Sequence, residues 1–450
     1  MSRFTGMNKP QLFQLSPADW RSHVLACQPD IVFALSDTPF TDPPYSQKRL
    51  TKSIERSANW LAALLKPVDP ALPTELASVV SEPAPREFES PTHPLNILLH
   101  MSGGTSIPAR RAFADSLLEV LYGPEADAIQ PLKTLDEGVK GYTFDLVPLR
   151  QSLEAEKRKK IGLPAMLLPS TTPNSVQLQN AVEMEDHIDE INSLLKASLL
   201  KTPPAKLRLI NSTEGPHEIL ELITEVGVDM FDAQWAQRAA DIGVALDFEF
   251  PVRHQPTTEK KREVGHNLYD ESFALDFGTL ADSFQGATPL DISAAPGSSN
   301  APSLGNIFVC PCAACSPTTP SQRIYHGIDN SEFTFDASSS VPSPQPHYTR
   351  AYIHHLLHTH EMGAHSFLVM HNLEVLEKFF EGVRGVIEAS ESAARSSSSE
   401  GMTLWDKEVK TFVQAYDEPA ALFARARESW RKVDLARGKG RLAREKETDT

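Results

Sequence analysis

The stretch KLRLINSTEGPHEILELITEVGVDMF (residues 206–231) determines the fold class, because its pattern changes from strand to helix and back to strand. Lys206–Ile210 is a short apolar run typical of a strand, whereas Glu218–Val226 repeats apolar residues at helical spacing. Met230 and Phe231 then begin another short strand. A strand, a helix and a strand in succession are typical of a parallel βαβ unit. The sequence therefore predicts an α/β protein.

The same alternation occurs at three earlier places in the chain. Apolar runs predicted to be strands are Asp30–Leu35, Leu95–Leu99 and Ala165–Leu168. The helices predicted to follow them are Gln47–Leu65, Ala109–Leu121 and Val182–Leu200. With this many units the pattern favours a (β/α)8 TIM-type barrel, and a doubly wound sheet is the alternative.

Composition and charge limit the class of protein. The 450 residues carry a formal net charge of -16, which argues against a chain that binds nucleic acid over its whole surface. Any contact with RNA must therefore be local, and the basic runs Lys157–Lys160 and Arg437–Lys446 are more typical of solvated faces. No run approaches the roughly 18 to 20 apolar residues of a membrane span, and the start lacks a secretory signal. The sequence predicts a cytoplasmic protein without an integral membrane segment.

Cysteine usage indicates a metal site. Three of the four cysteines, Cys310, Cys312 and Cys315, lie within CPCAAC. This clustering is typical of metal binding in a reducing compartment, and three thiolates in one tight loop can bind one zinc ion at about 2.3 Å. The fourth cysteine, Cys27, is expected to be a small core residue.

The fourth zinc ligand is expected to be a histidine, because residues 347–371 contain seven of them. His354 and His358 are one turn apart on a predicted helix Ala351–Met362, so both can face one ion. His371 is predicted to open the following helix. Spacing alone does not decide between these candidates. A closed site with four protein ligands leaves no position for water, so it predicts a structural metal and not a catalytic one.

Several motifs together make the chain similar to the tRNA-guanine transglycosylase family. They are DIVFALSDTP (30–39), GVDMFD (227–232), CPCAAC (310–315), YTRAYIHHLL (348–357) and HNL (371–373). The resemblance implies a (β/α)8 barrel with an inserted zinc-binding subdomain, and it selects His371 as the fourth ligand of one structural Zn²⁺. It also implies that the first barrel strands are missing from this chain.

The resemblance combined with composition predicts the domain organisation. Residues 1–390 are expected to form the transglycosylase-like barrel, with the zinc subdomain at about 306–390. Residues 391–401 are expected to be a Ser-rich linker, because they include four consecutive serines. Residues 402–450 are expected to form a helical C-terminal extension.

The resemblance also bears on catalysis. In the family an Asp of GVDMFD attacks the ribose C1′, and Asp232 keeps this position. Other expected groups are changed: Ser36 replaces the Asp that recognises the base, unless Asp37 substitutes for it, and the family's second catalytic Asp has no counterpart. The remaining departures are Ser102–Gly104 in place of a Gln-Gly-Gly loop, Phe144–Leu149 in place of a glycine-rich loop, and a single arginine, Arg238, after Asp232. Asp232 is therefore expected to be idle.

These changes resemble the non-catalytic branch of the family. The resemblance implies an accessory subunit that forms a heterodimer with a catalytic queuine tRNA-ribosyltransferase subunit and contacts tRNA. The complex exchanges guanine for queuine at wobble position 34 of tRNAs with GUN anticodons (Asp, Asn, His, Tyr), and some members associate peripherally with the mitochondrial outer membrane. One alternative is an active transglycosylase that uses Asp232 as nucleophile. The other is a metal-dependent hydrolase that uses the histidines of residues 347–371.

Overall fold

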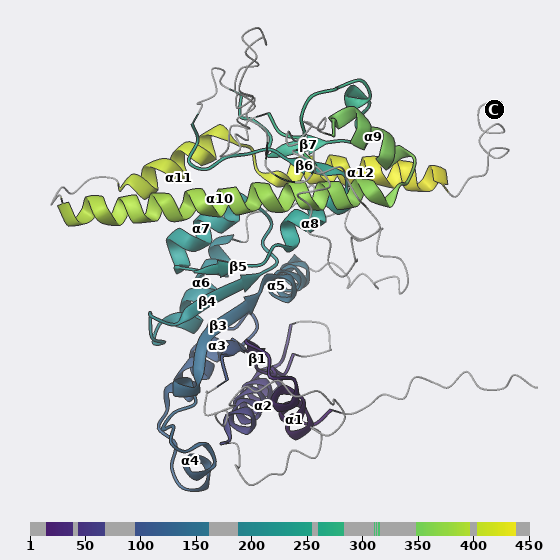
Figure 1. The fold of residues 1–450 in the computed structure, drawn as a ribbon. Helices are drawn as coiled ribbons and strands as arrows, with labels where there is room; N and C mark the ends of the chain where they lie inside the picture. Colours follow the sequence, from purple (N-terminus) through teal and green to yellow (C-terminus); the bar gives the residue numbers. More distant parts are fainter. Residues whose placement is uncertain are drawn as a thin grey trace, which may run out of the picture. The chain divides into compact units, whose positions relative to one another are not determined.

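The computed structural model divides into two compact units (Figure 1). Unit 1 comprises Met1–Pro169, Glu185–Ser212 and Glu221–Asp232, and unit 2 comprises Ser170–Met184, Thr213–Leu220 and Ala233–Thr450. The structure describes residues 15–38, 44–67, 95–161, 188–253, 260–282, 310, 312, 314–315, 348–396 and 403–437. The strand predicted at Ala165–Leu168 and the basic run that follows Arg437 lie outside these residues.

Unit 1 contains a parallel sheet of five strands. They are β1 (Val32–Phe33), β2 (Ile97–His100), β3 (Val139–Asp145), β4 (Leu207–Asn211) and β5 (Met230–Phe231). Each strand pairs in parallel with the next one along the chain, so the spatial order is the sequence order. The α/β class predicted from the alternation pattern is confirmed. A doubly wound sheet reverses its order at a switch point, and the described strands show no such reversal.

Helices connect and cover these strands. They are α1 (Pro17–Cys27), α2 (Gln47–Leu65), α3 (Ile107–Leu118), α4 (Pro124–Ile129), the 3₁₀ turn η1 (Asp136–Gly138), α5 (Leu146–Ile161), α6 (Ile188–Leu199) and α7 (Pro216–Val226), whose residues are divided between the two units. Helices α1, α2, α3 and α6 pack in that order, each against the next. Their buried faces meet the sheet in one core that includes Leu61, Leu99 and Phe113. Cys27 is exposed at the end of α1, so its predicted place in a core is wrong.

The strand β3 is not predicted by the alternation pattern, because Lys140 and Gly141 interrupt its apolar run. Gly141 has a packing reason: a β-carbon there would lie 2.6 Å from the carbonyl oxygen of Leu207 on the neighbouring strand. Tyr142, fully buried, donates its hydroxyl to Asp136 at 2.5 Å. Close backbone approach at Gly141 and the buried hydrogen bond of Tyr142 therefore add to the packing of Val139 and Phe144 in the core.

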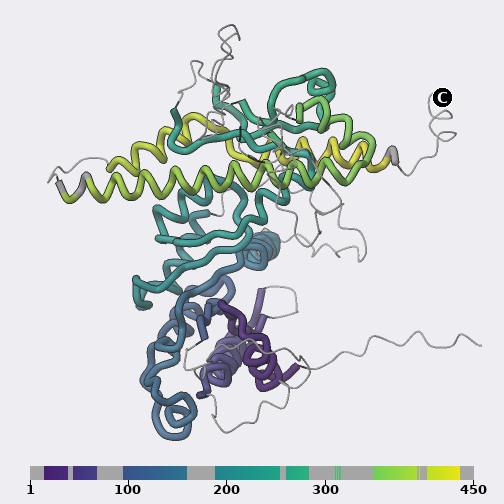
Figure 2. The backbone as a smooth tube through the Cα atoms, in the orientation of Figure 1, coloured from purple at the N-terminus to yellow at the C-terminus, as the bar shows by residue number. Residues whose placement is uncertain are grey.

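Unit 2 is mainly helical. It contains α8 (Gln234–Asp241), the antiparallel pair β6 (Val244–Leu246) and β7 (Gly265–Asn267), the 3₁₀ turn η3 (Glu271–Phe273), α9 (Arg350–His358), α10 (Met362–Ser396), α11 (Leu404–Ala415) and α12 (Pro419–Arg437). The long helix α10 packs against α8, β6, α9 and α11, and Figure 2 shows the C-terminal segments, in yellow, running beside it. Because α10 ends at Ser396, it includes the first residues of the predicted Ser-rich linker.

An aromatic core holds the C-terminal helices of unit 2 to α8 and α10. Its rings are those of Trp235, Phe248, Phe250, Phe379, Phe412, Tyr416 and Phe423. Phe248 lies at its centre, within 6.5 Å of the rings of four neighbours, which include Phe379 and Tyr416. Such rings bury large apolar areas, so α11 and α12 are part of this core. This core in turn supports the helix that carries His371.

Candidate metal centre

Four side chains that can bind a metal meet in unit 2. Cys310, Cys312, Cys315 and His371 are all buried, and their ligand atoms lie within 4.8 Å of one another. The Nδ1 atom of His371 is 3.4 Å from Sγ of Cys315 and 3.7 Å from Sγ of Cys312. In a tetrahedral zinc site, ordinary bond lengths place nitrogen and sulfur ligands about 3.6 Å apart. The group can therefore hold a metal ion, and its spacing suits zinc.

His371 lies in the interior of α10, nine residues after the helix begins at Met362, so its predicted place at a helix start is wrong. Its side chain is completely buried, and Nε2 lies 2.9 Å from the carbonyl oxygen of Leu246 on β6. A carbonyl can only accept, so Nε2 donates to Leu246 and Nδ1 faces the sulfurs. Backbone contacts of this kind orient metal-binding histidines. Burial lowers the pKa of His371, but hydrogen bonds with Cys312 and Cys315 outweigh it and raise this pKa to about 10.

Asn372, the next residue, was not singled out by the sequence. Its Oδ1 accepts from the backbone N–H of Leu246 at 2.9 Å, and its Nδ2 donates to the carbonyls of Val244 at 2.9 Å and Ala236 at 3.1 Å. These bonds hold α10 against β6 and α8, which positions His371. The HNL motif could have pointed to Asn372. Its amide lies next to the candidate ligand His371, and a buried amide at such a position usually hydrogen-bonds to the backbone.

Electrostatics within the cysteine group favour a bound cation. Hydrogen bonds with the Cys312 and Cys315 thiols raise the pKa of Cys310 far above its usual range, and hydrogen bonds from Cys310 and Cys315 lower the pKa of Cys312. The three sulfurs therefore share protons and negative charge within one buried group. The backbone N–H of Cys315 also donates to Sγ of Cys312 at 3.3 Å. A divalent cation would allow all three sulfurs to be thiolates at once.

His354 and His358, the alternative zinc ligands, do not join the cysteines; they form a separate group with Glu271. A third group of ligand-type side chains combines Asp247, His266 and Asp282. The structure thus brings together the four residues that the family resemblance selects. The two histidines that spacing alone left open lie elsewhere in unit 2.

Asp232, the position of the family nucleophile, follows β5 in unit 1. Its Oδ2 accepts from the backbone N–H of Ser212 at 2.9 Å. Ser212 has a left-handed backbone with φ of 67°, which is uncommon for a residue other than glycine. The carbonyl of Ser212 in turn accepts from Arg150 at 2.9 Å. Asp232 is therefore engaged in holding a strained turn at the end of β4.

Asp37, the residue that could replace the missing base-recognising Asp, is also engaged. Both of its carboxylate oxygens lie 2.8 Å from the guanidinium of Arg49, and Arg56 approaches to 3.3 Å. The hydrogen bonds from Arg49 hold the pKa of this carboxyl below its usual range, despite the opposing effect of burial. The backbone N–H of Asp37 donates to Ser57 at 3.0 Å. Two arginines of α2 thus keep Asp37 ionised and tied to that helix.

At the other positions where the chain departs from the family motifs, the side chains are buried or hydrogen-bonded within the fold. Strand β3 ends at Asp145 and α5 begins at Leu146, so no glycine-rich loop separates them. Phe144 and Leu146 are buried there. The hydroxyl of Ser102 lies 3.2 Å from that of Ser57. Arg238 donates to the carbonyl of Thr213 within unit 2.

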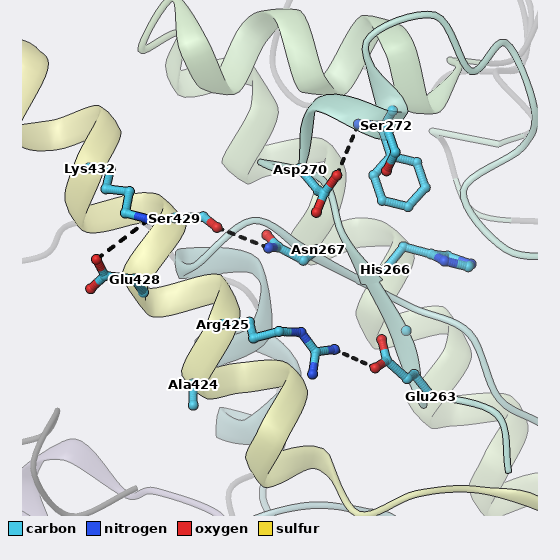
Figure 3. A pocket seen from close by; sticks show the side chains of 12 residues that line it. Glu263, His266, Asn267, Asp270, Ser272, Ala424, Arg425, Glu428, Ser429 and Lys432 are labelled. Carbon is cyan, nitrogen blue, oxygen red and sulfur yellow. Dashed lines mark hydrogen bonds and ion pairs between the residues drawn. The ribbon is translucent and has the colours of Figure 1, made fainter. Parts of the chain in front are cut away.

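A polar hollow of ≈ 580 Å³ lies between the β7–η3 segment and α12 (Figure 3). Its charged walls are already paired: Arg425 binds Glu263, and Glu428 binds Arg431 and Lys432. The amide of Asn267 donates to Ser429 at 3.2 Å. Asp270 accepts hydrogen bonds from the backbone N–H of Ser272 at 2.9 Å and from its side chain, so these polar groups of the lining stabilise the start of η3.

Residues 174–397 match the family model described as "Queuine tRNA-ribosyltransferase". This span contains Asp232 and all four residues of the candidate metal centre. The resemblance to this family is confirmed. Within the described ranges, no helix has the length and apolar character needed to cross a membrane.

Three relatives from different organisms share the description queuine tRNA-ribosyltransferase accessory subunit 2. The protein of Caenorhabditis elegans is 26% identical over 259 residues, which is 57% of this chain and 52% of the relative. The human protein is 27% identical over 203 residues, covering 44% of this chain and 41% of the relative. The protein of Schizosaccharomyces pombe is 26% identical over 179 residues, covering 40% and 28%. The chain thus matches about half or less of the length of these relatives.

Proposed function

We propose that this chain is the non-catalytic accessory subunit of a heterodimeric queuine tRNA-ribosyltransferase. It pairs with a catalytic subunit of the same family and helps to bind tRNA. The complex exchanges guanine for queuine at wobble position 34 of tRNAs with GUN anticodons, namely those for Asp, Asn, His and Tyr. Support comes from the match of residues 174–397 to the family and from relatives described as accessory subunit 2.

The observation that carries the proposal is the engagement of the carboxylates at the carboxyl ends of the unit 1 strands. A carboxylate nucleophile works only when it is presented to the substrate and a second group manages the protons. Asp232 accepts from the backbone of Ser212, and Asp37 is bound by two arginines of α2. Neither is presented as a free catalytic group, which favours an accessory subunit over an active transglycosylase that uses Asp232.

The metal and the fold complete the proposal. One structural Zn²⁺ per subunit is held by Cys310, Cys312, Cys315 and His371, and this closed set leaves no position for a reacting water. The five parallel strands in sequence order belong to a (β/α)8 barrel in residues 1–390, with the zinc subdomain at about 306–390. Helices α11 and α12, between Leu404 and Arg437, belong to a helical C-terminal extension that follows α10. We place the protein in the cytoplasm.

Base exchange tests the proposal directly. Radiolabelled guanine or queuine incorporation into tRNA is measured with the chain alone, with a catalytic family member alone, and with the two mixed. We expect no incorporation by the chain alone and more with the mixture than with the catalytic member alone. Size measurement of the mixture should show one complex. Incorporation by the isolated chain would support the alternative, in which Asp232 is the nucleophile.

A further inference from the structure

Glu271, His354 and His358 bring three ligand atoms within 4.8 Å of one another in unit 2. The two histidines lie four residues apart on α9, so they stand one above the other on the same face of the helix. Their ring centroids are 4.1 Å apart. Two imidazoles at this helical spacing with one carboxylate from another segment form a donor set that zinc uses.

Both imidazoles are held in the orientation that metal binding requires. Nδ1 of His354 lies 2.9 Å from the carbonyl oxygen of Leu268, and Nδ1 of His358 lies 3.0 Å from the carbonyl oxygen of His354. Because carbonyls only accept, each Nδ1 carries the proton and each Nε2 keeps a lone pair. Backbone acceptors that fix the tautomer in this way are typical of metal-binding histidines.

The carboxylate completes the set from η3. Oε2 of Glu271 is 4.0 Å from Nε2 of His354, and the Glu271 side chain is 87% exposed, so it can turn without disturbing the fold. Nitrogen and oxygen ligands of one zinc ion lie about 3.4 Å apart. A movement of well under one side-chain length therefore brings the carboxylate into range.

The group of Asp247, His266 and Asp282 shows why similar composition is not enough. There the guanidinium of Arg350 lies 3.1 Å from Nε2 of His266 and 2.7 Å from Asp282. Nε2 of His266 is also 2.8 Å from Asp247. The guanidinium of Arg350 already pairs with Asp282 and lies against the ring nitrogen that would bind a metal, so this group has less need of a metal ion. No arginine or lysine contact of this kind occurs among the described contacts of Glu271, His354 and His358.

We propose that Glu271, His354 and His358 form a second metal site, which binds Zn²⁺ or a similar divalent transition metal and links η3 to α9. It shares no residue with the Cys310, Cys312, Cys315 and His371 group. With three ligands, one of them exposed, it binds zinc more weakly than the four-ligand site and leaves a coordination position for water. Imidazole and carboxylate donors suit zinc and cobalt, whereas magnesium and calcium favour all-oxygen sets.

Zinc titration of the purified full chain tests this site. Weakly held metal is first removed with a mild chelator, and Zn²⁺ is then added in competition with a chromogenic chelator. We expect the chain to keep one tightly bound zinc and to take up one more. Glu271→Gln and His358→Ala should each weaken uptake of the second zinc at least about tenfold and leave the first in place. His355→Ala, an exposed neighbour on α9, is the matched control and should bind both.

Cobalt provides an independent reading of the same sites. Co²⁺ at the cysteine site should show a thiolate charge-transfer band, whereas Co²⁺ at the second site should add only weak ligand-field bands. The Glu271→Gln variant should lose the weak ligand-field bands of the second site and keep the thiolate charge-transfer band of the cysteine site. A wild-type chain that takes up only one equivalent, or variants that still take up two, would overturn the proposal.

Discussion

His371 and Asn372 are adjacent on α10, and the structure gives them different roles. His371 faces the cysteines, while Asn372 binds three backbone groups of Ala236, Val244 and Leu246. A metal site needs ligands that are already oriented, because binding energy would otherwise be spent on ordering them. The amide of Asn372 therefore orients His371 toward the cysteines without being one of the four candidate ligands.

Asn372→Ala should lower the free energy of unfolding by about 2–4 kcal/mol, because it leaves a buried N–H and two buried carbonyls without their partner. Chemical denaturation of the zinc-loaded chain measures this loss. Leu373→Ala is a suitable control, since Leu373 is 40% exposed and a smaller effect is expected. Equal losses from the two variants would show that Asn372 has no special role.

Cys312→Ser should remove the tightly bound zinc and lower the melting temperature, because a serine hydroxyl does not replace a thiolate ligand. Metal content by atomic absorption and thermal unfolding check both effects. Cys27→Ser changes an exposed cysteine and should alter neither. If Cys312→Ser kept the tight zinc while His354→Ala lost it, the ligand assignment would be wrong.

At this scale the sequence predicted that the three cysteine sulfurs lie together, because short spacing keeps their side chains in one loop. Spacing could not choose His371, since it follows Cys315 by more than fifty residues and its approach depends on tertiary packing. The family resemblance supplied that choice. The role of Asn372 and the exposure of Cys27 both depend on which helices and strands pack nearby. Local sequence patterns carry little information about such tertiary packing.

Among the elements, α10 shows how one helix can need glycine at one position and tolerate it at another. A β-carbon at Gly382 would overlap the carbonyl oxygen of Phe250, whereas one at Gly385 would meet nothing within 4 Å. Both glycines lie inside the same helix, where alanine has the better intrinsic propensity. At Gly382 packing requires glycine although helix propensity favours alanine. At Gly385 packing places no such requirement.

Gly382→Ala should destabilise the chain by about 1–3 kcal/mol, because α10 must move away from Phe250 to relieve the overlap. Gly385→Ala should stabilise it by about 0.5–1 kcal/mol, since alanine loses less backbone entropy than glycine. Urea unfolding of the two variants and the wild type gives both values. Effects of the same sign would contradict the close approach of α10 to Phe250.

Element prediction succeeded where local signals were strong. The bounds of α2, Gln47–Leu65, agree with the sequence pattern because Ser46 caps its first turn and a clear apolar stripe follows. Helix α10 begins earlier than predicted, at Met362, because its first turn contains a glycine and no acidic residue, so it gave little signal of a helix start. Strand β3 was missed because Gly141 interrupts its apolar pattern. That glycine is required by the close approach of Leu207 on β4, a contact between residues far apart in the sequence.

For the whole molecule, the sequence order of β1 to β5 is what the alternation pattern predicts for consecutive βα units. Closure into a barrel requires further strands and a matching tilt, and local patterns do not encode either. The proposed function likewise depends on a second chain that this sequence does not contain. Tests at this scale must therefore use the assembled complex.

Asp232→Asn in the assembled complex tests most directly whether Asp232, at the family nucleophile position, takes no part in catalysis. Asparagine keeps an acceptor oxygen for the N–H of Ser212, so the fold should be preserved while nucleophilicity is lost. With an intact catalytic partner, the rate of queuine incorporation should stay within about threefold of wild type, a change of roughly 0.7 kcal/mol or less in the barrier.

The matched control places the same substitution at the corresponding Asp of the proposed catalytic partner. There it should abolish incorporation, because under the proposed function that carboxylate is the nucleophile. Denaturing gels of stalled reactions locate the adduct, since the chain that carries covalent tRNA is the chain that supplies the nucleophile. We expect the adduct on the partner alone. A hundredfold loss of rate from Asp232→Asn, or tRNA bound covalently to this chain, would identify Asp232 as a working nucleophile and this subunit as an enzyme.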